Sequence, residues 1–83
     1  MTDKTIKRVQ TGMRIEQRLL KVMKGLAEYL DLSLGDLTEG IVLHALDGKD
    51  PFGESTRAKI EQLRAVYDLD LRAEDSHRLH EDP

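Results

Sequence analysis

Residues 7–15, KRVQTGMRI, are the stretch of sequence that decides the fold we expect. Val9, Thr11, Met13 and Ile15 alternate with basic, polar or small residues, and this alternation is typical of a β-strand with one buried face. The rest of the chain reads as helix, so this strand has no partner within its own chain. Because the backbone N–H and C=O groups of a strand need hydrogen-bonding partners, we expect it to pair with a second copy of itself. The stretch therefore predicts a dimer.

The spacing of apolar residues changes after this strand. Apolar residues recur every three or four positions over residues 16–30, which predicts an amphipathic helix. Ser33 is a good N-cap for a second helix, which should end at residue 46 or 47, close to Gly48. Asp36, three residues after Ser33, can complete an arrangement like a capping box. These signals predict two consecutive helices joined by a short connection.

The second helix is apolar around most of its circumference, which predicts burial against a symmetry-related copy. Its apolar residues are Leu34, Leu37, Ile41, Val42, Leu43, Ala45 and Leu46. Gly25 and Gly40 lie inside the two helices, where each costs about 1 kcal/mol relative to alanine. Close approach of another helix would explain both glycines.

The last third of the chain starts with a break and continues as a third helix. The sequence KDPFG at residues 49–53 contains the turn-forming residues Pro and Gly, and Ser55 can cap a helix over residues 56–68. Beyond Leu71 the chain is polar and weakly patterned, and we expect it to fray. The fold class expected is thus mostly α with one β-strand.

Length and composition limit the class of protein. A chain of 83 residues is one small domain, for which oligomerisation commonly supplies additional buried surface. It contains no cysteine, which excludes disulfides and thiolate metal sites. We find no apolar core of a signal peptide and no apolar run that could span a bilayer, and we expect a cytoplasmic protein without membrane contact.

Charge is distributed unevenly along the chain. Residues 1–24 contain seven lysines and arginines and two acids, whereas residues 25–83 contain six and fourteen, so that a net charge of −3 conceals a basic N-terminal part. Two basic segments brought together in a dimer would produce a positive field that suits nucleic acid. The alternative, that these cations only solubilise a surface, carries similar weight.

The order of one strand, a helix of about four turns, a short connection and a serine-capped helix resembles the ribbon-helix-helix family of Arc/MetJ/CopG-type repressors. The resemblance covers about residues 7–47. It implies an intertwined homodimer whose two strands form an antiparallel β-ribbon that enters the major groove of double-stranded DNA. The division that follows is an N-terminal arm (1–6), a DNA-binding and dimerisation domain (7–48), and a C-terminal helix with an acidic tail (49–83).

The outer face of the expected strand would read DNA bases. Arginine matches guanine and glutamine matches adenine through pairs of hydrogen bonds, so Arg8, Arg14 and Gln10 are candidate base contacts. Gly12, on the same face, would let the backbone approach the bases closely. The alternative for Gly12 is a β-bulge, which would turn Met13 outward.

Further contacts would fall on the DNA backbone and in the dimer core. Lys7 and the start of the second helix, at Ser33, Leu34 and Gly35, are candidate phosphate contacts, because N–H groups at a helix N-terminus bind anions. Asp36 weakens this site by repulsion. The residues expected in the dimer core are Val9, Met13, Ile15, Leu37 and Ile41.

We therefore predict a sequence-specific DNA-binding transcriptional regulator that acts as a repressor, is not an enzyme and uses no cofactor or metal. The competing interpretation is an antitoxin, in which residues 54–83 bind a basic protein partner. Ile60, Leu63 and Tyr67 of the third helix would contact that partner, or else dock on the chain itself, which the modest apolar stripe favours. His77 and His80, three residues apart in an acidic tail, are a weak metal-binding signal.

Overall fold

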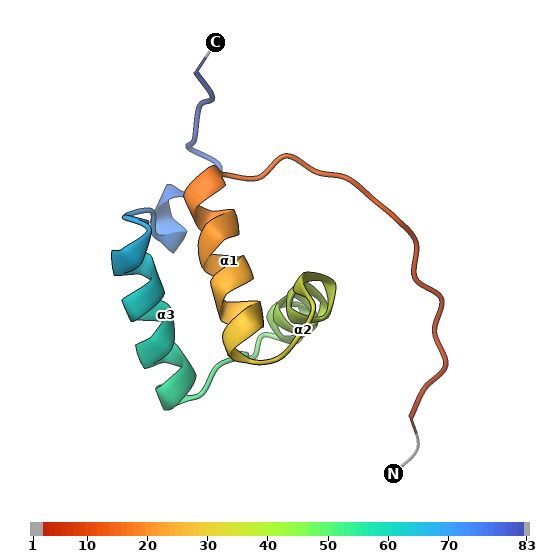
Figure 1. The fold of residues 1–83 in the computed structure, drawn as a ribbon. Coiled ribbons are helices and arrows are strands. Elements are labelled where there is room, and N and C mark those ends of the chain that lie inside the picture. Colours follow the sequence, from red (N-terminus) through yellow and green to blue (C-terminus); the bar gives the residue numbers. More distant parts are fainter. Residues whose placement is uncertain (1–2, 83) are drawn as a thin grey trace.

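Three helices of equal length and an extended N-terminal segment make up the structure. This computed structural model describes residues 3–82, in which α1 spans Gln17–Tyr29, α2 spans Leu34–Leu46 and α3 spans Glu54–Val66. A single turn of 3₁₀ helix, η1, follows at Ala73–Asp75. Figure 1 shows α1 in the middle, with α3 on one side of it and α2 on the other. Met1 and Thr2 of the expected arm and Pro83 of the tail lie outside the described residues.

The expected β-strand is absent from the described residues, and the predicted ribbon-helix-helix fold is wrong. Residues 7–15 are extended but belong to no strand, and their side chains are all exposed. No backbone group of residues 3–15 hydrogen-bonds to another described part of the chain. Exposed N–H and C=O groups can be satisfied by water. The alternating pattern therefore does not require hydrogen-bonded pairing with a second strand. The described fold is all-helical.

The first helix agrees with its prediction to within one residue at each end. Glu16 occupies the N-cap position, and its Oε1 accepts a hydrogen bond from the N–H of Leu19 at 2.9 Å. Val22 and Leu26 lie four residues apart, Ala27 follows Leu26, and all three are buried. These buried residues place α1 at the centre of the molecule, where it contacts both other helices.

The third helix docks on α1, as the favoured alternative for its apolar stripe predicted. Ile60 and Leu63 pack against the core formed by Leu26, Ala27 and Leu37. A Cβ atom at Gly25 would lie 3.0 Å from Cδ2 of Leu63, so the absence of a side chain allows the close approach that we expected. The helix starts earlier than expected, because Gly53 rather than Ser55 is its N-cap.

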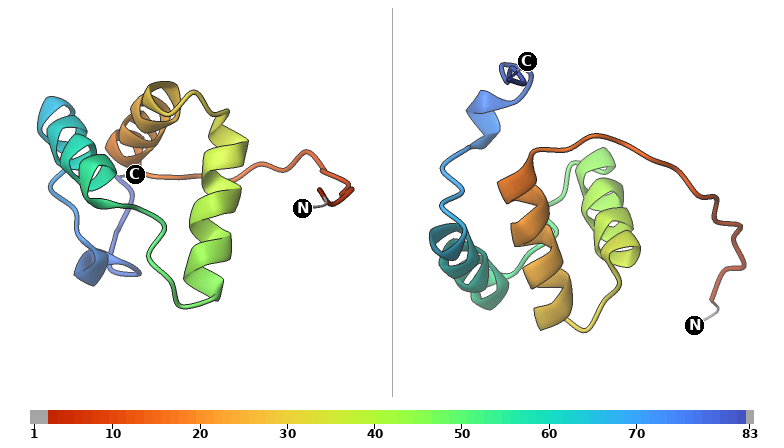
Figure 2. Two further views of the ribbon diagram at one scale, coloured as in Figure 1. Left: turned by 90° about the horizontal axis from the view of Figure 1, so that it is seen from below. Right: turned by 45° about the horizontal axis from the view of Figure 1, so that its top comes forward.

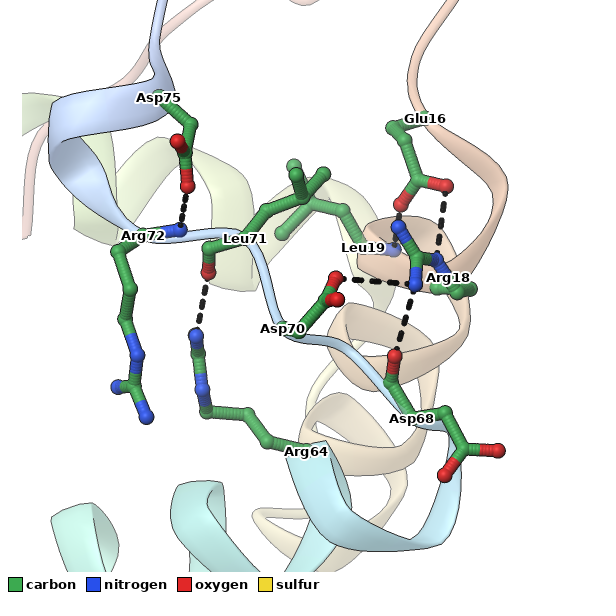
Figure 3. A network of polar contacts seen from close by, with 9 residues as sticks. All are labelled: Glu16, Arg18, Leu19, Arg64, Asp68, Asp70, Leu71, Arg72 and Asp75. Atoms are coloured by element: carbon green, nitrogen blue, oxygen red, sulfur yellow. Dashed lines mark hydrogen bonds and ion pairs between the residues drawn. The ribbon is translucent and has the colours of Figure 1, made fainter.

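The chain after α3 folds back on the helices instead of fraying at once. Leu69 is buried, and the guanidinium of Arg64 donates to the carbonyl oxygen of Leu71. The carboxylate of Asp75 accepts a hydrogen bond from the N–H of Arg72 at 2.7 Å, which closes the turn at η1. Figure 3 shows these contacts next to the start of α1. The acidic end of the chain is therefore fixed at least as far as Asp75.

The second helix has two apolar faces. Leu37 and Ile41, four residues apart, face the core that α1 and α3 share. Val42, Leu43 and Leu46 lie on the opposite face and are exposed, with Leu43 at 63% and Leu46 at 78% of full accessibility. The high apolar content of α2 is thus only half explained by contacts within the described chain.

Candidate nucleic-acid interface

The basic N-terminal segment, residues 3–15, runs outward from the start of α1 on the side of α2. Figures 1 and 2 show it arching past α2, away from α3. Among the described residues, it hydrogen-bonds to the rest of the chain only through two arginines, Arg8 to α2 and Arg14 to the C-terminal tail. Charged side chains, rather than apolar packing, therefore fix where this segment lies.

Arg8 pairs with Glu39 on α2. Its Nε and Nη2 atoms donate to Oε2 and Oε1 of Glu39, each at 2.8 Å, in a two-pronged arrangement across 31 positions of sequence. This hydrogen bonding, together with the attraction between the charges, lowers the pKa of Glu39 and raises the pKa of Arg8. The nearby charge of Asp36 also favours protonated Arg8. The first two turns of α2 therefore offer Arg8 a negative environment.

Arg14 pairs with Glu81 in the C-terminal tail. Both Nε and Nη2 of Arg14 donate to the same oxygen of Glu81, at 3.1 and 2.8 Å. The two side chains remain largely exposed, and neither belongs to a helix. Such a pair is weaker than a two-pronged pair anchored on a helix.

The other DNA contacts predicted in the segment, two base contacts and one phosphate contact, are exposed. Gln10 and Lys7 have their side chains in solvent. A Cβ atom at Gly12 would meet no other atom of the described chain within 4 Å. Contacts within this part of the chain therefore do not require a glycine there, and its predicted role in close approach to DNA stays a prediction.

Arg18, a further cation next to the basic segment, stabilises the fold. Its Nη1 atom donates to the carbonyl oxygen of Asp68 at 2.9 Å and to Oδ1 of Asp70 at 3.1 Å. Its Nε atom also contacts the carboxylate of Glu16 at 3.2 Å. Figure 3 shows the guanidinium between these partners, which join the start of α1 to the chain after α3. Lys21 and Lys24 of α1, in contrast, are exposed.

The carboxylate that caps α1 is held in its charged form by this network. Burial raises the pKa of Glu16, but hydrogen bonds from the N–H of Leu19 and from Arg18 outweigh that effect, and the pKa is lowered. The hydrogen bond that Arg18 donates to Glu16 in turn raises the pKa of Arg18. The network explains why this acid lies within the basic part of the sequence.

The predicted phosphate site at the start of α2 has the expected local geometry. Oγ of Ser33 accepts a hydrogen bond from the N–H of Asp36 at 3.0 Å, which confirms Ser33 as the N-cap. Leu34 and Gly35 follow as the first helical residues, whose N–H groups have no acceptor within a helix. The carboxylate of Asp36 lies in the same turn and opposes binding of an anion.

The residues predicted for the dimer core fall into two groups. Val9 and Met13 are exposed, at 77% and 73% of full accessibility, and Ile15 is at the border of exposure. Leu37 and Ile41 instead belong to the core of their own chain. The exposed face of α2 at residues 42–46, which our list of core residues omitted, offers more free apolar surface than Leu37 or Ile41.

Glu39 and Glu81 are the functional candidates that sequence reasoning missed. Glu39 is one of two acids in the otherwise mostly apolar α2, and this was the one signal that could have drawn attention to it. Glu81 lies among many acids in the tail, where no local pattern distinguishes it. Both were identified only by the fold, which brings them to the two arginines.

Other kinds of site were sought in the same part of the chain. Within residues 3–82, no three His, Cys, Asp or Glu side chains gather in a way that could hold a metal ion. The helices of this range are all too short or too polar to cross a membrane.

Comparisons of the chain with protein-family models, curated proteins and solved structures found no significant match. The function must therefore be argued from the residues and their arrangement alone.

Proposed function

We propose that this protein is a sequence-specific DNA-binding regulator that binds DNA with the basic segment 3–15 and acts as a homodimer. The observation that carries the proposal is the state of this segment: it is extended, exposed and rich in cations, and two ion pairs attach it to α2 and to the C-terminal tail. The segment contributes no buried side chain to the core, and its exposed side chains are of the types that bind DNA.

The residue types in the segment cover both parts of DNA recognition. Lys4 and Lys7 can neutralise phosphates, which supplies affinity without regard to sequence. Arg8 and Arg14 can each donate two hydrogen bonds to guanine, and Gln10 can pair with adenine. Extended backbone on both sides of Gly12 lets these side chains reach a groove with little steric hindrance.

The exposed face of α2 supports the homodimer. Val42, Leu43 and Leu46 form one apolar stripe, because residues three and four apart share a helix face. Around a two-fold axis this stripe would pack on its own copy, since a symmetric dimer uses the same patch twice. Such a dimer would also place two basic segments on one particle and double the number of DNA contacts.

DNA binding is tested by fluorescence anisotropy with labelled duplexes from the region upstream of the gene, against a scrambled duplex of equal length. We expect binding that weakens steeply with salt, because each neutralised phosphate releases counterions. Arg14→Ala should lower affinity about 5- to 100-fold and reduce the preference for the cognate duplex, since one bidentate contact is worth about 1–3 kcal/mol.

Arg78→Ala is the matched control for this experiment, because it removes the same charge from an exposed arginine of the tail. We expect its affinity to stay close to that of the wild-type protein. Equal losses in both variants would show that net charge alone governs binding, and the proposed role of the segment in reading sequence would be rejected.

The homodimer is tested by sedimentation velocity over a range of protein concentrations. Leu43→Lys should shift the equilibrium to the monomer, because a charge would be placed in the apolar stripe. Val66→Lys is the control, since Val66 is as exposed as Leu43 but lies on α3. A wild-type protein that remains monomeric at hundreds of micromolar would contradict the dimer.

The antitoxin interpretation receives less support. It needs an apolar stripe on α3 that is free to bind another protein, and Leu63 and Tyr67 of that stripe lie against Gly25 of α1. We therefore put forward DNA binding as the single proposed function.

A further inference from the structure

We propose that Glu39 is an internal competitor of DNA: its carboxylate occupies the Arg8 guanidinium in the free protein and keeps DNA affinity below the value that the basic segment could reach. The inference rests on the proposed function and adds a means by which the chain regulates its own binding site.

The geometry of the pair prevents Arg8 from binding Glu39 and DNA with the same N–H groups at the same time. Nε and Nη2 of Arg8 each donate to one oxygen of Glu39 at 2.8 Å. A guanidinium uses the same two-pronged donor set for a phosphate or for the edge of guanine. Arg8 cannot offer these two N–H groups to DNA while Glu39 holds them, so binding of DNA through this edge has to break the pair.

Glu39 is better placed for this role than Glu81, the partner of Arg14. Glu39 lies in the middle of α2, so the helix fixes its backbone, and the charge of Asp36 one turn earlier adds to its effect on Arg8. Glu81 lies in the tail and accepts both hydrogen bonds from Arg14 with a single oxygen. The larger effect on DNA binding is therefore expected from Glu39.

The pair also determines where the basic segment lies in the free protein. Arg8 is separated from Glu39 by 31 positions, and among the described residues no backbone hydrogen bond holds residues 3–15 to the helices. Loss of the pair would release the middle of the segment while the helices stay in place. Competition and release of the segment are thus two measurable consequences of one contact.

The first experiment measures the dissociation constant for the cognate duplex by fluorescence anisotropy at fixed salt. Glu39→Gln should bind about 2- to 5-fold more tightly than the wild-type protein, as expected for removal of one exposed ion pair that opposes binding. Glu28→Gln is the matched control, because it makes the same change of charge at an exposed glutamate of α1. Its gain in affinity should stay below about 1.5-fold, because removal of one distant negative charge has only a weak, screened effect on DNA binding.

A double-mutant cycle isolates the pair. In an Arg8→Ala background, Glu39→Gln should improve affinity no more than Glu28→Gln does, because the guanidinium for which Glu39 competes is gone. Equal gains from Glu39→Gln with and without Arg8 would overturn the inference.

A second readout is independent of DNA. The heteronuclear ¹⁵N NOE of residues 7–10 should fall in Glu39→Gln and remain unchanged in Glu28→Gln, since only the former releases the segment. If the wild-type protein binds DNA but Glu39→Gln and Glu28→Gln behave alike, the inference fails and the proposed function stands. If neither the wild-type protein nor Glu39→Gln binds DNA, both fail, whatever the NOE shows.

Discussion

The helical body and the N-terminal segment of this protein are held in place by different forces. In the body, Leu26, Ala27 and Leu37 form a buried cluster on which parts of all three helices and the connection at Phe52 pack. In the segment, every side chain is exposed, and two ion pairs attach it to the rest of the described chain. Apolar burial responds little to salt, whereas exposed ion pairs are screened by it. One chain therefore combines a body of fixed shape with a segment whose position depends on the ionic conditions.

The largest expected difference between the two regions concerns truncation of an apolar side chain. Leu26→Ala should lower the free energy of unfolding by about 2–5 kcal/mol, because it leaves a cavity in the core. Val9→Ala should change it by less than about 0.5 kcal/mol at concentrations where the protein is monomeric, because Val9 is exposed. Urea unfolding followed by circular dichroism measures both values. A loss of more than 1 kcal/mol in Val9→Ala would mean that the segment is part of the core.

A smaller effect separates two glycines within the body. Gly40→Ala should stabilise the monomer by up to about 1 kcal/mol, because alanine favours the helix and no described atom lies within 4 Å of the new Cβ. Gly25→Ala gains the same helix preference but forces Leu63 to move, an overpacking cost of about 1–3 kcal/mol. Unfolding experiments should therefore rank Gly40→Ala above Gly25→Ala. Equal stabilities would show that α3 does not pack tightly on α1.

The smallest expected effect is the titration of Glu39. Its pKa is lowered by the hydrogen bond from Arg8, so the folded protein favours the charged carboxylate more than the unfolded chain does. The pair is therefore complete above the pKa of an ordinary glutamate and is lost as the pH falls through the lower pKa of the folded state. NMR titration of the side-chain carboxyl carbon of Glu39 measures this pKa. It should be lower in the wild-type protein than in the Arg8→Ala variant. Identical values in the two proteins would contradict the pair.

Local signals in the sequence were sufficient to predict the first two helices. Ser33 caps α2 as expected, and Gly48 has a φ of +69°, a left-handed conformation that glycine adopts without strain. Each of these signals acts within a few residues of the helix end that it determines. The start of α3 was predicted less well, because Ser55 seemed the better N-cap while the chain enters the helix at Gly53.

The strand could not be predicted reliably from alternation alone. Residues 7–15 alternate as a half-buried strand does, but a strand also needs an edge with which to pair, and the described helices provide none. The alternation therefore indicates only which side chains an extended segment would present together. The pairing of Arg8 with Glu39 was missed for a related reason, since it joins residues 31 positions apart and follows from the packing of α2.

The contact of Arg18 with Asp68 and Asp70 has a mechanical consequence. It joins the first turn of α1 to the chain just after α3, so the stretch between them forms a loop closed by a side chain. Figure 1 shows that both terminal segments leave the body at this same end. Tension applied to the two termini would therefore load the outer Arg14–Glu81 pair first and the Arg18 contact second, and it would reach the helices only after both had broken.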